Sequence, residues 1–147
     1  MKHNLDENSF HDNLIHGIEF FSDSGELSSD IAFNIDYIEK WVRTKKGEIL
    51  FVISSALLKF HEVTDLKILI DWGESNNTLF SGDAPGFYIN SIKKEKIISP
   101  ISDDSFLWTI HTSNQNNHIH FGAACFSLEF TGEQRTVNRQ FLLKNER

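Results

Sequence analysis

The sequence predicts a mainly β protein with about eight short, mostly antiparallel strands in a sandwich or a partly closed barrel, and at most one or two short helical turns. Two observations carry this prediction. Apolar residues alternate with polar ones along most segments instead of recurring at helical spacing. Turn-forming residues separate these segments. The 147 residues suffice for one core, so we expect a single globular β domain over 1–147, with residues 1–9 loosely ordered.

The first predicted strands lie in the N-terminal half of the chain. In the segment 30–37, alternate residues fall on opposite faces, which is typical of a half-buried strand: Ile31, Phe33, Ile35 and Tyr37 on one, and Ala32, Asn34 and Asp36 on the other. The following stretch IEKWV either continues this strand or makes one helical turn. The run around residues 50–53 is apolar on both faces and predicts a central strand.

Three further strands are predicted later in the chain. The segment 65–72 alternates and ends before Gly73. The lysine-rich segment 87–98 indicates an edge strand, because lysine discourages pairing with other chains. A last strand is expected over 135–143.

A β-hairpin is predicted where two β-rich runs flank the polar loop TSNQNN at residues 112–117. Symmetric closure on this loop places His111 opposite His118 and Thr109 opposite His120. The second run changes phase after residue 121, so we expect an extra residue near GAAC, with a bulge at Gly122.

Composition excludes several classes of function. The chain carries 14 basic and 21 acidic residues, a net charge of −7, and the basic residues form no stripe, which argues against nucleic-acid binding. Its single cysteine permits no intramolecular disulfide and no thiolate cluster. The polar N-terminal stretch and the short apolar runs argue against membrane insertion, so we expect a cytoplasmic protein.

The stretch HDNLIHG at residues 11–17 places His11, Asp12 and His16 at the start of an apolar run. Phosphohydrolases that bind metals through a His-Asp pair need packed helices, which this sequence does not predict. We therefore expect Asp12 to form a turn or cap hydrogen bond. We expect His16 to be half-buried and bonded to backbone, on one face with Leu14, Ile18 and Phe20. These residues remain weak candidates for ligand binding. His61-Glu62 is expected to form a turn or bulge.

The hairpin supplies the one candidate metal site. Its register places His111, His118 and His120 on one face, an arrangement that suits zinc with an open fourth position. A cupin-type site would need a glutamate four or five residues after His120, where Ala124 and Cys125 stand. The alternative is a polar outer face that is rich in histidine.

The stretches FHDNLIHGIEF, DIAFNIDYIEKW and LLKFHEVTDLKILIDWG, together with IHFGAACF, resemble a family of uncharacterised bacterial proteins of about this length. This resemblance implies a shared small β domain and no particular chemistry. A looser similarity, through the HD pair and an F-x-x-V turn from Phe60 to Val63, is to immunity proteins of bacterial toxin systems.

No nucleophile elbow, phosphate-binding loop or dinucleotide fingerprint occurs in the sequence. We therefore expect a non-catalytic binding module for a protein or a small ligand, with no cofactor unless zinc binds, and a monomer or weak homodimer. The alternatives are a metal-dependent hydrolase that uses the three histidines and an immunity-like protein.

Overall fold

The computed structural model describes residues 9–22, 29–71, 87–97 and 105–147, and these ranges form nine strands in two antiparallel sheets. The expectation for residues 1–9 therefore lies outside the described residues, apart from Ser9. The strands and the single 3-10 turn are β1 (Leu14–Ser22), β2 (Ser29–Arg43), β3 (Ile49–His61), β4 (Thr64–Leu69), β5 (Ile89–Lys96), β6 (Phe106–Thr112), β7 (His118–Ala123), β8 (Cys125–Phe130), β9 (Arg135–Val137) and η1 (Lys144–Glu146).

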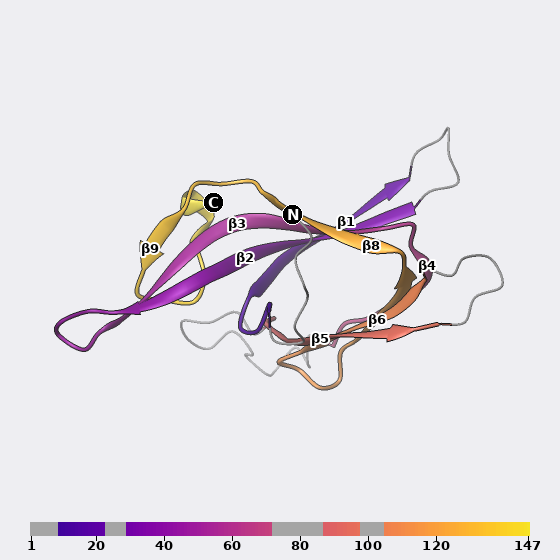
Figure 1. Cartoon of the computed structure of the whole chain (residues 1–147), viewed down its shortest axis with the longest axis horizontal. Coiled ribbons are helices and arrows are strands. Elements are labelled where there is room, and N and C mark those ends of the chain that lie inside the picture. The colour runs from indigo at the N-terminus through magenta and orange to yellow at the C-terminus, as the bar shows by residue number, and fades with distance from the viewer. Residues whose placement is uncertain (1–8, 23–28, 72–86, 98–104) are drawn as a thin grey trace.

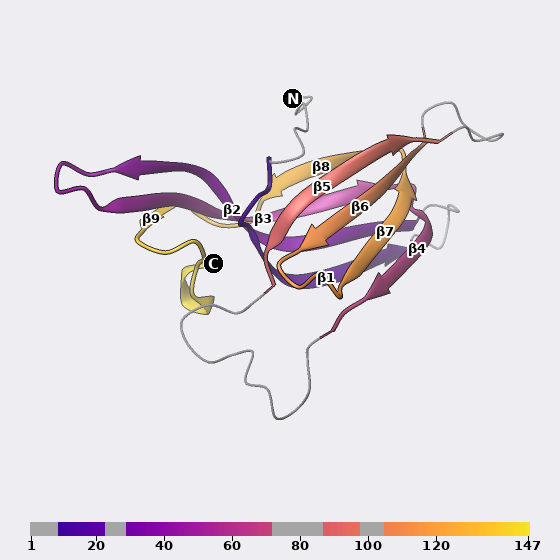
Figure 2. The same cartoon turned by 90° about the horizontal axis from the view of Figure 1, so that it is seen from below.

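The two sheets face each other as a sandwich, which confirms the predicted mainly β fold (Figure 1). Sheet A has the order β1-β2-β3-β8, and β9 pairs with β3 farther along. Sheet B has the order β4-β7-β6-β5 and lies in front of sheet A in Figure 2. In the described part of the chain the sheets do not close into a barrel, and no helix there is long and apolar enough to cross a membrane.

The core lies between the sheets, because alternate residues of each strand point inward. Phe60 stands near its centre, with its ring centroid 5.1 Å from that of Trp108 and 4.8 Å from that of Phe121. Trp108 satisfies its buried indole N–H by donating to the Ala123 carbonyl at 3.0 Å. The inward residues are almost fully buried and include Ile31, Phe33, Ile35, Leu58, Ile110 and Ile119. Burying each such side chain stabilises the fold by about 1.5–3 kcal/mol.

Beyond the sandwich, β2 and β3 continue together as a two-stranded projection, which Figures 1 and 2 show extending away from sheet B. We call residues 38–53 the arm. Its register runs from Ile38 opposite Ile53 to Arg43 opposite Ile49. The turn at its tip uses Gly47 at a φ of 83°, a conformation that favours glycine. The stretch IEKWV thus continues the strand, with a bulge at Glu39.

The predicted hairpin register is confirmed. Trp108 pairs with Phe121, and Thr109 pairs with His120. The predicted bulge at Gly122 is wrong. The phase changes because the strand ends: β7 belongs to sheet B and β8 to sheet A, and the chain crosses between the sheets at Ala124.

A second crossing, between β3 and β4, lies beside the first. The Ala124 N–H donates to the His61 carbonyl at 3.2 Å and ties the two crossings together. Glu62 follows at a φ of 56°, so the expected turn at His61-Glu62 is confirmed. At this corner both connections pass from one sheet to the other, and the hydrogen bond between them pairs main-chain groups that have left the strand ladders.

The strands predicted over 87–98 and 135–143 are both present, and the second is shorter than predicted. The lysine-rich strand β5 is an edge strand, as expected. The strand expected over 135–143 is shorter, because β9 ends at Val137 and the chain then folds over the outer face of sheet A. There Leu142 is only 1 % exposed, and its burial against that face replaces further strand pairing.

Candidate functional site

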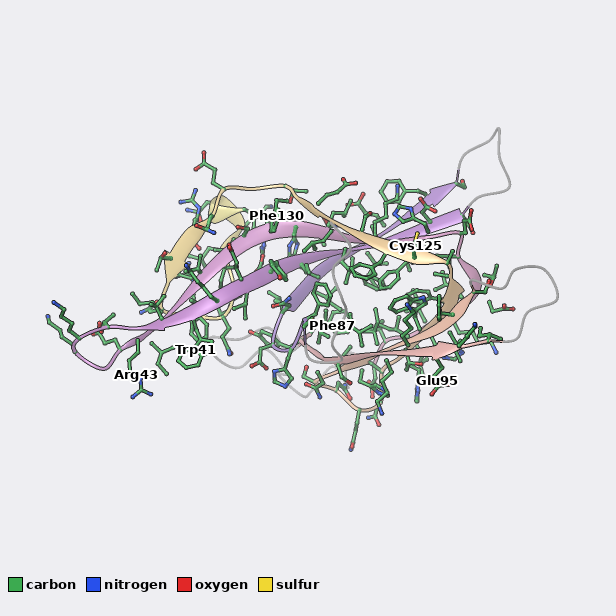
Figure 3. The ribbon with its side chains drawn as sticks, viewed as in Figure 1. Trp41, Arg43, Phe87, Glu95, Cys125 and Phe130 are labelled. Carbon is green, nitrogen blue, oxygen red and sulfur yellow. The ribbon has the colours of Figure 1, made fainter. Side chains whose placement is uncertain are left out.

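A surface hollow of about 690 Å³ lies between the arm and the turn that precedes β1. The arm contributes Trp41, Ile49 and Phe51 to its wall, together with the cations of Lys40 and Arg43. Trp41 is 63 % exposed, which is unusual for so large an apolar side chain. Figure 3 shows Trp41 and Arg43 on the same side of the arm. The volume is in the range of small-ligand and side-chain pockets.

His11 and Asp12 line the opposite wall of this hollow. Asp12 adopts a φ of 65°, and its N–H donates to the Ile89 carbonyl at 2.8 Å, so the turn expected at this residue is confirmed. Its carboxylate accepts a hydrogen bond from Gln140 at 3.2 Å and lies 3.1 Å from the His11 Nδ1 atom. Two of the three weak binding candidates therefore stand at the same concave surface.

Asn13 joins this turn to the arm. Its side chain is almost fully buried, and its Oδ1 atom accepts the Ile38 N–H at 3.0 Å. The buried Nδ2 atom has no hydrogen-bond partner among the described residues. A buried amide donor without a partner costs free energy, so this is a position where a ligand or water acceptor would stabilise the structure.

His16 is not part of the hollow. It is the extra residue of a bulge in β1, between Ile15, which pairs with Ile35, and Gly17, which pairs with Asn34. The bulge puts Leu14 and Ile18 on opposite faces, so the expectation that His16 shares a face with both is wrong. The His16 Nε2 atom lies 3.5 Å from the Asp36 carboxylate on the outer face of sheet A.

Asp36 is a fully buried carboxylate. The Arg147 guanidinium binds both of its oxygens, at 2.9 and 2.7 Å, and the Leu142 N–H donates to it at 2.9 Å. Burial and then the charge of Arg147 lower the pKa of His16 below its ordinary value, against opposing effects of Asp36 and a backbone hydrogen bond at Ile35. These contacts fasten the C-terminal segment to the sheet.

The three hairpin histidines lie on the outer face of sheet B, as the register predicts. His111 and His118 are exposed and His120 is partly exposed, while Ile110 and Ile119 face the core. Among the residues that the structure describes, no three histidine, cysteine or acidic side chains come together as a group able to hold a metal ion. The geometry therefore does not support the zinc site, which stays a prediction.

A chain of side-chain hydrogen bonds that the sequence did not predict crosses the outer face of sheet A. His61 Nε2 lies 2.8 Å from the Ser127 hydroxyl, and His61 Nδ1 lies 3.1 Å from the Asp30 carboxylate. Burial alone would raise the pKa of Asp30, but hydrogen bonds from Lys59, the Glu62 N–H and His61 outweigh it and lower that pKa.

This order of groups is that of a nucleophile, a base and an orienting acid. However, the Asp30 carboxylate is also held by Lys59 at 3.1 Å, and the three residues belong to neighbouring strands. A structural role therefore explains this chain of hydrogen bonds, because it ties β2, β3 and β8 together. No sequence motif signals it, because strand register alone brings these residues together.

No protein-family profile, curated protein or solved structure matches this chain, so the assignment of function rests on its own geometry.

Proposed function

We propose that this protein is a non-catalytic binding module, and that the hollow beside the arm binds a segment of a partner protein. The observation that carries the proposal is the exposed Trp41 in the wall of a concave surface, next to Ile49, which is 43 % exposed. Tryptophan side chains in such positions contribute much of the free energy of protein interfaces. Exposed apolar surface of this kind is otherwise unfavourable in water.

The surroundings of Trp41 favour a protein segment over a buried cofactor. The hollow is lined by both apolar and charged side chains, including Arg43 and Asp12, as are the polar rims of protein interfaces. The immunity-like alternative is a special case of this proposal in which the partner is a toxin.

The test is affinity capture from lysate of the source cells with three forms of the purified protein, quantified by mass spectrometry. We expect a partner that is retained stoichiometrically by the wild type and lost with Trp41→Ala. Phe20→Ala is the matched control, because Phe20 is 67 % exposed but lies on β1 and does not line the hollow. Equal retention by all three forms, or turnover of a substrate in a general hydrolase screen, would contradict the proposal.

A further inference from the structure

The edge of β2 is open along the arm. β1 pairs with β2 only as far as Leu14 opposite Asp36, whereas β2 continues to Arg43. Over the described residues, no strand pairs with this edge beyond Asp36. The ladder stops where Asp12 adopts a left-handed conformation and donates its N–H to the Ile89 carbonyl at 2.8 Å instead of to β2.

Hydrogen-bond alternation identifies the groups that this edge presents. The Thr44 N–H donates to the Glu48 carbonyl across the arm, so Thr44 faces β3. Backbone groups of successive residues in an antiparallel strand point to opposite edges. The N–H and C=O of Arg43 and of Trp41 therefore point to the open edge. Asn13 Oδ1 already binds the Ile38 N–H on this edge, in the way that a carbonyl of an added strand would.

The charge of the arm indicates the kind of strand that fits. Residues 38–53 contain four basic and two acidic side chains, 4 − 2 = +2, in a chain whose net charge is −7. Lys40 and Arg43 line the hollow together with the carboxylates of Glu39 and Asp12. Gln134 donates to Glu39, and Gln140 donates to Asp12. A second copy paired edge to edge would bring the same cations of two arms together, which is unfavourable. An acidic strand would instead be attracted to the arm.

We propose that the open edge of β2 binds an extended, acidic segment of a partner protein as an added antiparallel or parallel strand, with an apolar side chain of that segment packed against Trp41. This inference rests on the proposed function and specifies its binding mode. Main-chain hydrogen bonds to Trp41 and Arg43 supply affinity, and the side chains of the hollow supply selectivity.

The direct test uses a synthetic seven-residue peptide in the order glutamate, valine, valine, glutamate, glutamate, valine, valine, which presents acidic and apolar side chains on both faces. Its affinity for the whole protein is measured by fluorescence anisotropy and by Trp41 shifts in NMR spectra. We expect binding that is lost when the valines are N-methylated, because methylation blocks main-chain hydrogen bonds on both edges of the peptide. A peptide with lysine in place of glutamate should not bind.

Two protein variants test the electrostatic part. Lys40→Glu/Arg43→Glu should weaken binding of the glutamate peptide by about tenfold or more. Lys93→Glu/Lys96→Glu makes the same change of net charge on β5, away from the hollow, and should leave the affinity within about twofold.

The outcomes separate this inference from the proposed function. Equal binding of the N-methylated peptide would overturn strand addition but leave the hollow as a binding site. No binding of the glutamate peptide, with Trp41-dependent capture of a partner intact, would overturn the inference alone. A dimer in sedimentation equilibrium that Trp41→Ala dissociates would assign the edge to a second copy and overturn it as well.

Discussion

Asp36 and Arg147 form the most deeply buried ion pair among the described residues, and each depends on the other. Removing the guanidinium would leave a fully buried carboxylate with only the Leu142 N–H at 2.9 Å and the nearby His16 ring. We expect Arg147→Ala to lower the free energy of unfolding by about 3 kcal/mol, because an unpaired buried charge is costly. Urea denaturation monitored by tryptophan fluorescence measures this loss.

The double variant Asp36→Asn/Arg147→Ala should recover part of that stability, since it removes the unpaired charge. Arg43→Ala is the control, because Arg43 is exposed and should change stability by less than about 0.5 kcal/mol. If Arg147→Ala unfolds at the same urea concentration as the wild type, the ion pair does not form in solution.

His16 makes stability depend on pH in a definite direction. Its pKa in the folded protein lies below the ordinary value of 6.5, because of burial and then the charge of Arg147. The unfolded chain therefore binds a proton more readily than the folded one. The stability contribution is fully present above about pH 7 and is lost as the pH falls through 6.5 toward the lowered pKa.

We expect His16→Gln to reduce the loss of stability between pH 7.5 and pH 5, measured as the urea midpoint at each pH. His118→Gln is the matched control for the loss of an imidazole, because His118 is exposed and lies on sheet B, away from Asp36 and Arg147. If the urea midpoint of His16→Gln falls with pH as steeply as that of the wild type, His16 is not the group whose titration causes the loss.

For single residues, the sequence predicted some positions in the fold and missed others, for identifiable reasons. The turn at Asp12 was predictable because aspartate tolerates the left-handed conformation. The face on which His16 lies was not predictable, since a one-residue bulge moves the residues that follow it to the opposite face of the sheet. Asp36 follows an alternating pattern that reads as a solvent-facing position, and only Arg147, 111 residues away, explains its burial.

Among the elements, the closeness of β4 and β7 depends on Gly122. A Cβ atom at this position would lie 2.5 Å from the Thr64 Oγ1 atom. We expect Gly122→Ala to destabilise the protein by about 1–3 kcal/mol through this overlap. In a double-mutant cycle measured by urea denaturation, Gly122→Ala should cost much less stability when it is made in the Thr64→Ala protein than when it is made in the wild type. Equal losses in both backgrounds would place the strain elsewhere.

The elements were predictable where their pattern is local. The hairpin register follows from its loop length and from the alternation that buries Ile110 and Ile119. The crossing at Ala124 is not predictable, because the change of phase in the sequence is the same whether a strand contains a bulge or passes to another sheet. The sequence does not predict the arm, because Trp41 and Val42 alternate as in any strand. They are exposed because the arm extends beyond sheet B, so no second sheet covers its faces.

For the whole molecule, the structure separates residues that hold the fold from residues available for binding. Phe60 is fully buried at the centre of the ring contacts, and Phe60→Ala should cost about 3–5 kcal/mol of stability. Trp41→Ala should change stability by less than about 0.5 kcal/mol, because its side chain is mostly exposed. Thermal unfolding of both variants checks this contrast. A large loss in Trp41→Ala would show that the arm packs on the fold in solution.

The paired crossings at His61 and Ala124 bring together residues that are far apart in the sequence. They make β3 pair with β8, so that His61 and Ser127 meet across 66 residues, and the Asp36–Arg147 pair closes a still longer loop of 111. Such long-range pairing makes folding slow, on a scale of about milliseconds to seconds. We expect the Asp36–Arg147 contact to form after the transition state, so in stopped-flow experiments Arg147→Ala should speed unfolding and leave the refolding rate nearly unchanged. The C-terminal segment then sets the unfolding rate, and hence the lifetime of the folded molecule, while the pairing of the sheets sets the folding rate.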